Sequence, residues 1–144
     1  IIDLERRSAG KISFLPRRTF ENYLIHPKAL SCLMSTMPAF DGVSDLENKI
    51  HEWLLSNGKK FLSSKNVAVP LSDEWLKEVD GAKCLQDSLS SLSENKEEYK
   101  KTSHGVWLIC WLLDNHPNYL DDLIEFIKNI IIKSMELKTN SKKI

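Results

Sequence analysis

The chain has 144 residues, and its 20 basic and 20 acidic side chains leave no net charge at neutral pH. This length suits one domain with a core of its own, and 42% apolar and 28% charged residues are typical of a globular protein. Because there is no overall positive field, any contact with nucleic acid has to be local.

No apolar run approaches the roughly 20 residues that span a bilayer, since the longest is Val106–Leu113. Charged residues within the first ten exclude the core of a signal peptide, and the start at Ile1 predicts a fragment of a larger protein. The cysteines are odd in number and form no C-x-x-C pair, which argues against a disulfide framework or a zinc site. We therefore expect a cytoplasmic protein with three buried, reduced thiols and no membrane contact.

In chain order, the first clear pattern is the alternation of polar and apolar residues in Lys11–Leu15, which Pro16 ends. It predicts a short edge strand, the one strand that we expect. Two short helical segments follow at 20–25 and 28–37, the second ended by Pro38. The N-terminal third is thus predicted to be a strand followed by a broken helical hairpin.

Capping signals predict further helices in the middle of the chain. Ser44 and Glu47 have the spacing of a capping box, and their helix should end at 57–58 with a left-handed glycine. Ser72 can cap the next helix, and Asp80-Gly81 marks the turn before a helix at 82–92.

The C-terminal third is predicted to hold two helices. Val106–Leu113 is apolar on all sides, which predicts a helix buried on most faces. Apolar residues from Leu120 to Ile131 recur at helical spacing and predict a long amphipathic final helix. The expected fold class is mainly α with a short strand, as a single domain over 1–137 with a basic flexible tail at 138–144.

The first candidate site is the pair Asp3 and Glu5. Carboxylates at i and i+2 on a strand end lie on one side of the strand, and carboxylate oxygens are ligands that Mg²⁺ prefers. The alternative is a ragged, solvated terminus.

The second candidate is the segment Leu15–Leu24, which contains Arg17 and Arg18 just before a short helix with Glu21. Two adjacent guanidinium groups can hold a phosphate in bidentate fashion. The alternative is that both arginines are solvated and that one of them pairs with Glu21 in a surface contact of little energy.

The third candidate lies just before the helix that starts near residue 105, where Lys101 and His104 accompany a glycine and two hydroxyl groups. Such a segment can form a phosphate pocket, because the first amides of a helix have no partners within it. Alternatively, His104 is a cap residue with no role in binding.

Taken together, these segments resemble the TOPRIM-like region that follows the AAA or ABC-type ATPase module of bacterial defence proteins akin to the overcoming-lysogenisation-defect (OLD) nucleases. The family has an Asp-x-Asp-type pair at a strand end, where this chain has Asp3 and Glu5. A Leu-Pro-Arg-Arg-x-x-Glu-Asn-Tyr-Leu-like stretch follows, matched by Leu15–Leu24, and later a Lys-Thr-x-His-Gly-like stretch, matched by Lys101–Gly105.

The resemblance implies the helical C-terminal portion of a TOPRIM-like α/β domain in a metal-dependent nuclease or an inactive relative. It implies Mg²⁺ or Mn²⁺ as cofactor, ATP only through an upstream ATPase module of the same chain, and DNA and a homo-oligomer of the parent as partners. The fragment by itself should not be a competent nuclease, since the ATPase and an upstream glutamate strand are missing. The implied roles are metal binding for Asp3 and Glu5, catalysis for Glu21 and Lys101, and phosphate binding for Arg17, Arg18 and His104.

A second hypothesis remains open, namely a non-catalytic helical interaction or oligomerisation domain. In that case the basic residues of the motifs lie on a solvated face, and the long final helix packs against a partner. The two hypotheses differ in geometry, because a site requires that Asp3, Glu5, Glu21 and Lys101 converge.

Overall fold

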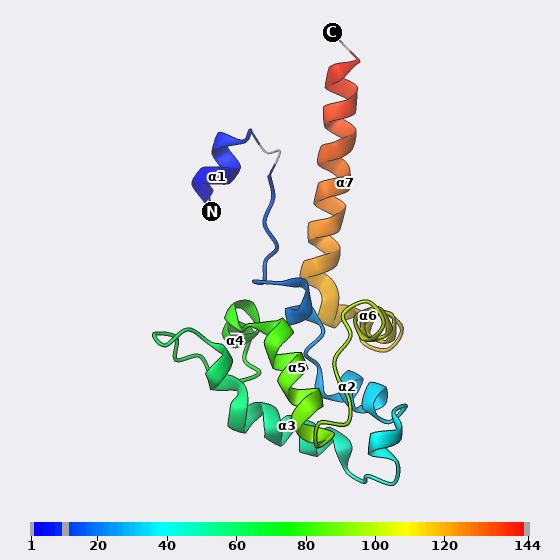
Figure 1. Ribbon diagram of the computed structural model, residues 1–144. Helices are drawn as coiled ribbons and strands as arrows, with labels where there is room; N and C mark the ends of the chain where they lie inside the picture. Colours follow the sequence, from blue (N-terminus) through cyan, green and yellow to red (C-terminus); the bar gives the residue numbers. More distant parts are fainter. Residues whose placement is uncertain (1, 10–11, 143–144) are drawn as a thin grey trace.

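The computed structural model describes residues 2–9 and 12–142, and the side chains of Ile2 and Glu5 lie outside the described part. Most of these residues are helical and none is in a strand, which confirms the mainly-α class but not the predicted short strand. The elements in Figure 1 are α1 (Ile2–Arg7), η1 (Phe20–Tyr23), α2 (Pro27–Met34), η2 (Pro38–Phe40), α3 (Leu46–Asn57), η3 (Gly58–Phe61), α4 (Asp73–Glu78), α5 (Gly81–Leu92), α6 (His104–Asn115), η4 (Pro117–Leu120) and α7 (Asp121–Ser141).

A helical body extends from η1 to η4, and α1 and α7 stand away from it on one side (Figure 1). Within the body, α2 packs against both α3 and α6, and η1 packs against α5 and α4. The core fills the space between these elements with apolar side chains, each worth about 1.5–3 kcal/mol when fully buried. The largest fully buried side chains are Trp75, Tyr23, Leu24, Ile25, Met34, Ile50, Leu54, Leu85, Leu108, Leu112, Leu120 and Val79.

The predicted edge strand is an extended segment that links α1 to the body (Figure 1). Its described part, 12–15, alternates between exposed and half-buried residues, but the apolar Ile12 and Phe14 are the exposed ones. No neighbouring strand among the described residues pairs with it, and a strand needs the backbone of a partner to form a ladder. The strand assignment was therefore wrong, and the apolar side of the pattern is not the buried side.

The helix starts show which capping predictions hold. Ser72 accepts the Trp75 amide at 3.2 Å, as predicted, and Asp80, which the sequence marked only as a turn, accepts the Lys83 amide at 3.2 Å and caps α5. The predicted capping box at Ser44 does not form, because α3 starts after Asp45.

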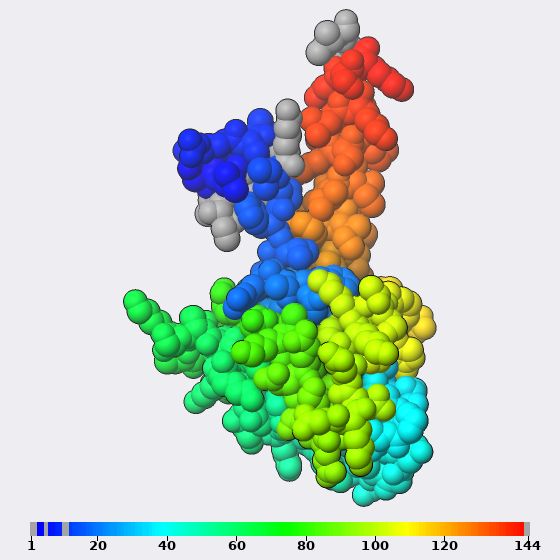
Figure 2. All heavy atoms as spheres, viewed as in Figure 1, coloured from blue at the N-terminus to red at the C-terminus, as the bar shows by residue number. Residues whose placement is uncertain are grey.

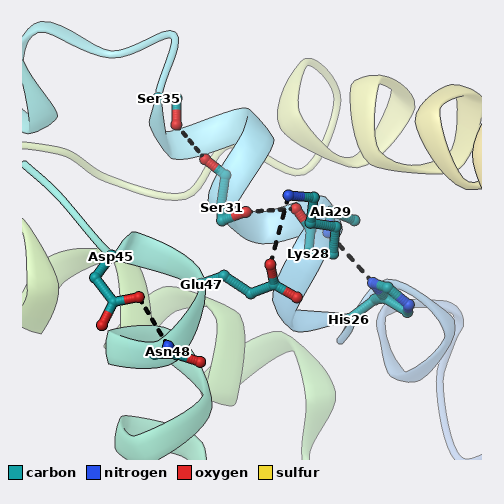
Figure 3. A network of polar contacts seen from close by, with 8 residues as sticks. All are labelled: His26, Lys28, Ala29, Ser31, Ser35, Asp45, Glu47 and Asn48. Carbon is teal, nitrogen blue, oxygen red and sulfur yellow. Dashed lines mark hydrogen bonds and ion pairs between the residues drawn. The ribbon is translucent and has the colours of Figure 1, made fainter.

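Glu47, the glutamate of the predicted capping box, contacts another helix instead. Glu47 forms an ion pair with Lys28 of α2 at 3.4 Å (Figure 3). The same figure shows a cap that the sequence did not reveal, since Nδ1 of His26 accepts the Ala29 amide at 3.3 Å at the start of α2.

Gly58 does not adopt the predicted left-handed conformation, since its φ is −59° and the chain continues into η3. The glycine is required by packing instead. A Cβ at this position would lie 2.8 Å from the Pro70 Cβ, and the Gly58 carbonyl accepts a hydrogen bond from the Trp75 indole at 3.0 Å. Close approach of two segments, rather than a helix exit, explains this residue.

Helix α6 is less buried than its composition predicted. Leu108 and Leu112 are fully buried, but Val106 is 57% exposed and Leu113 48%. The prediction of three buried thiols was also wrong, because only Cys84 is buried, while Cys32 is half-buried and Cys110 is exposed on α6. Burial raises the pKa of the Cys84 thiol to about 12.

Helix α7 is the long final helix that the sequence predicted, and it has 21 residues. It continues to Ser141, so residues 138–141 belong to the helix rather than to a separate tail, in keeping with the lack of glycine or proline in this part. Only Leu123 of α7 is buried. None of the described helices, α7 included, is both long and apolar enough to cross a membrane.

Candidate functional site

Asn22 is the structural centre of the most distinctive sequence segment. Its side chain is fully buried, and its amide nitrogen donates to the carbonyls of Leu76 and Val79, both at 2.9 Å. The Thr19 hydroxyl donates to its amide oxygen at 2.7 Å. These bonds satisfy the amide from both sides and join η1 to the end of α4, so Asn22 holds the segment in place.

The turn at Asp80-Gly81 packs directly on this asparagine. A Cβ on Gly81 would lie 2.3 Å from the Asn22 amide oxygen and 2.8 Å from its backbone nitrogen. Only glycine permits this approach, which brings the start of α5 against η1. The segment around Asn22 and the turn at Asp80-Gly81, which the sequence analysis considered separately, therefore pack together, and we call this contact the joint.

Arg17 is held by the same joint. Its Nη1 donates to the Asn22 carbonyl at 3.1 Å, and its guanidinium carbon lies 4.5 Å from the ring centroid of Tyr23 and 5.4 Å from that of Tyr119. Tyr119 in turn donates its hydroxyl to the Ile25 carbonyl. Stacking between two aromatic rings gives Arg17 a structural role that links η1 to η4.

Arg18 faces solvent, and its backbone amide donates to the Lys77 carbonyl at 2.8 Å. Both arginines line an open groove of about 520 Å³ between residues 13–18 and the end of α4, where Lys77 and Glu78 complete the lining. The groove therefore carries three cations and one carboxylate, and the Arg18 guanidinium faces it without the packing that fixes Arg17.

Glu21 and Lys101, the two predicted catalytic residues, are brought together although they are far apart in the chain. The Lys101 Nζ lies 3.0 Å from Oε1 of Glu21, whose side chain is only 4% exposed, while that of Lys101 is 74% exposed. The contact is an ion pair, and Oε1 has no properly directed hydrogen bond to any described group. A buried carboxylate with a single exposed cation is poorly compensated, which is unusual for a purely structural residue.

Tyr99 lies next to this pair. Its buried hydroxyl has no hydrogen-bond partner within the described part of the chain, and it lies 3.2 Å from where a Cβ on Gly105 would be. Burial and, secondarily, the negative charge of Glu21 raise the pKa of Tyr99 to about 12. The hydroxyl is therefore a neutral donor beside the first turn of α6.

His104 forms a local turn at the start of α6. Its Nδ1 accepts the Lys100 amide at 2.9 Å, and its own amide donates to the Lys100 carbonyl at 2.8 Å. Burial and the positive charge of Lys100 lower the pKa of His104, while Glu97 opposes the shift. His104 is thus the first residue of α6 and not its cap, since the N-cap is Ser103, which makes no side-chain cap bond, and the His104 side chain accepts an amide that precedes the helix.

The predicted metal ligands lie elsewhere. Asp3 is on α1, away from the body (Figure 1), and pairs with Arg6 at 3.2 Å and Arg7 at 3.6 Å. The expected strand end is a helix, where side chains at i and i+2 point to different sides. The side chain of Glu5 falls outside the described residues, and within the rest no group of three or more potential metal ligands occurs.

Sequence reasoning missed Asn22, Tyr99 and the stacking of Arg17. The signal for Asn22 was its position between Glu21 and Tyr23 in a conspicuous motif, but its partners are carbonyls of α4, and carbonyls leave no mark in a sequence. Tyr99 stands directly before the basic segment, and nothing in the sequence shows that its hydroxyl turns inward.

Comparison of the chain with known protein families, with curated proteins and with solved structures found no match.

Proposed function

We propose that this domain contributes a phosphate-facing site, centred on Lys101 and the start of α6, to a larger OLD-like ATP-dependent nuclease that acts on DNA. The observation that carries the proposal is the pairing of Glu21 with Lys101 at 3.0 Å. Of the four residues expected to converge, Glu21 and Lys101 meet, Asp3 lies on α1 away from them, and the side chain of Glu5 is outside the described residues.

The ammonium group of Lys101 is suited to a phosphate because it is held on one side only. Buried Glu21 anchors it, and the rest of the side chain remains exposed. The uncapped first turn of α6 adds amide donors, and the unpartnered Tyr99 hydroxyl adds a further donor next to Gly105. A phosphate here would be held by a fixed cation and neutral donors, an arrangement that can stabilise developing negative charge.

Magnesium fits this place only in part. Oε1 of Glu21 is a buried oxygen without a hydrogen bond, as a metal ligand can be, but it is one carboxylate, and Asp3 lies elsewhere. We therefore derive no step through a metal ion. A complete magnesium site would require further oxygen ligands besides Glu21.

The test is a titration of the isotope-labelled chain with a short DNA duplex, followed by NMR. We expect shifts of the backbone amides from Lys101 to Gly105. Lys101→Gln should weaken binding about tenfold, whereas Lys100→Gln, a matched change one residue away, should retain most of it. Shifts elsewhere only, or equal losses in both variants, would falsify the assignment.

A second titration with Mn²⁺ addresses the metal. Paramagnetic broadening centred on η1 that disappears in Glu21→Gln but persists in Asp3→Ala is the expected result for a site at Glu21. Broadening centred on α1 instead would assign the metal to the predicted Asp3 pair, and no broadening at millimolar Mn²⁺ would remove metal binding from the proposal for this chain.

A second function, a helical interaction module, is supported by one observation that the phosphate site does not explain. Helix α7 stands away from the body (Figures 1 and 2). Large apolar side chains of this helix are exposed. Solvent-exposed apolar stripes of this kind mark contacts with another protein.

A further inference from the structure

We propose that α7 pairs with α7 of a second copy of this chain in antiparallel orientation. The inference rests on the interaction module proposed above and not on the phosphate site. It starts from burial, because Leu123 is the only buried residue of a 21-residue helix.

Three of the six exposed large apolar residues of α7, namely Ile127, Ile130 and Leu137, lie on one stripe, and the others, Ile131, Ile132 and Met135, lie outside it. Leu123, Ile127, Ile130, Ser134 and Leu137 follow alternating steps of four and three residues, the spacing of a coiled-coil seam. Ile127, Ile130 and Leu137 are 46%, 40% and 49% exposed, so the seam is open beyond its buried first position. A seam of this type specifies a helix as its partner, since knobs of one helix fit holes of another.

The charges of α7 specify which way a second copy would lie. Residues 121–125 contain three carboxylates and no cation, and residues 137–142 contain two lysines and no carboxylate. Two parallel copies would place like charges together at both ends, whereas antiparallel copies place the acidic end of each against the basic end of the other. The antiparallel arrangement also opposes the two helix dipoles favourably.

The seam fits itself in this orientation. Antiparallel packing alternates the two kinds of core position, so Ile127 lies opposite Leu137 of the second copy and Ile130 lies opposite its Ser134. The small serine leaves room for the isoleucine, and each such layer occurs twice by symmetry. The same face of α7 in the two copies can therefore form the whole contact.

The N-terminal arm, which comprises α1 and the extended segment at 12–15, adds to this surface. Lys133 of α7 donates to the Ser13 hydroxyl at 3.4 Å, and Ala9 together with α7 residues lines a small cavity of about 220 Å³, so the arm runs beside the helix. A stable dimer of standard size buries about 800 Å² of each partner, more than one seam of a few turns supplies. We therefore expect a concentration-dependent dimer to which the arm adds area.

The first experiment is sedimentation velocity of the full chain at concentrations up to about 100 μM, the range in which a weak complex becomes visible. The wild-type chain should shift from monomer to dimer. Ile130→Glu should remain monomeric, and Asn129→Glu, which places the same charge one position away off the seam, should dimerise like the wild type. A monomer at every concentration, or equal behaviour of the two variants, would overturn the proposal.

The orientation is tested by reversing the charge of one end at a time. One variant carries Asp121→Lys, Asp122→Lys and Glu125→Lys, and the other carries Lys138→Glu and Lys142→Glu. Each should dimerise at least about tenfold more weakly alone, and an equimolar mixture should recover dimers, with circular dichroism checking that α7 remains helical. A parallel pair already has like charges together, so undiminished dimerisation of both variants would refute the antiparallel arrangement.

Failure of this proposal is distinguishable from failure of the phosphate site. Ile130 lies on α7 and Lys101 precedes α6, so Ile130→Glu should bind DNA as the wild type does. Conversely, Lys101→Gln should leave the sedimentation profile unchanged.

Discussion

Asn22 and Glu21 are neighbours in one turn and are buried to a similar degree, but their polar atoms differ in how many hydrogen bonds they form. Asn22 forms hydrogen bonds through both its amide nitrogen and its amide oxygen, whereas Oε1 of Glu21 has only the ion pair to exposed Lys101. Complete satisfaction marks a residue that holds the fold, and incomplete satisfaction marks a place where a group from outside can bind. The same motif therefore contains a structural joint and a candidate site.

The largest expected effect comes from breaking the joint. Asn22→Ala should lower the free energy of unfolding by about 3–5 kcal/mol, because it leaves the carbonyls of Leu76 and Val79 buried without donors. Urea denaturation measures the loss. Asn48→Ala, which removes an exposed side-chain bond to Asp45, is the control and should cost less than about 0.5 kcal/mol.

The next largest loss of stability is expected when a methyl group is added at Gly81, in the joint. Gly81→Ala should destabilise the chain by about 2–3 kcal/mol, since its Cβ would clash with the side chain and backbone of Asn22. In the double variant with Asn22→Ala, the cost of Gly81→Ala should fall but not vanish, because the clash with the backbone nitrogen remains. Strict additivity of the two changes in denaturation experiments would show that the residues do not interact.

A smaller effect should depend on pH through His26. Burial and the neighbouring His116 lower the pKa of His26, whose neutral Nδ1 caps α2. The unfolded chain then binds the proton more readily, so this contribution is complete above the unfolded pKa of about 6.5 and is lost as pH falls toward the folded value. The loss should not exceed about 1 kcal/mol, the usual worth of an N-cap.

Unfolding midpoints between pH 8 and 5 measure this slope. His26→Asn keeps an acceptor at the cap and should reduce the slope, and His51→Asn, at an exposed position of α3, is the matched control. The residual slope in His26→Asn should include His104, whose pKa is lowered in the same direction. An unaltered slope in His26→Asn would contradict the role of this cap.

The smallest effect on stability is expected at Tyr99, and it tests directly whether a buried polar group without a partner serves binding rather than folding. Tyr99→Phe removes a buried hydroxyl without a partner, so the free energy of unfolding should be unchanged or rise by less than about 1 kcal/mol. The same change should weaken binding of DNA if the hydroxyl serves the site. Tyr119→Phe is the matched control, because it removes a hydroxyl that donates to the Ile25 carbonyl and should cost about 1 kcal/mol.

The sequence predicted helix starts and helix faces well where they depend only on residues within one turn or on one face. The cap at Ser72 and the long final helix required only the residues of one turn or one face, and the structure confirms them. The capping box at Ser44 failed because α3 starts after Asp45, one residue later than the box requires, and Glu47 pairs with Lys28 of another helix instead. The predicted strand failed because a strand depends on a partner.

The candidate site was predictable only as a set of residue types. Glu21 and Lys101 were singled out from their motifs, but their contact depends on how η1 packs against the start of α6. The structural use of Arg17 could not be predicted, because the ring of Tyr119 that helps to hold it comes from near the other end of the chain.

The sequence by itself determined a mainly helical chain, the starts of several helices and the amphipathic character of α7, because these properties depend on spacing and on neighbours within a few residues. Tertiary structure alone decided that Asn22 is satisfied while Glu21 is not, that Arg17 is stacked, and that the apolar face of α7 is left uncovered. These outcomes depend on which distant groups meet, and burial and pairing between distant segments are properties of the packed molecule.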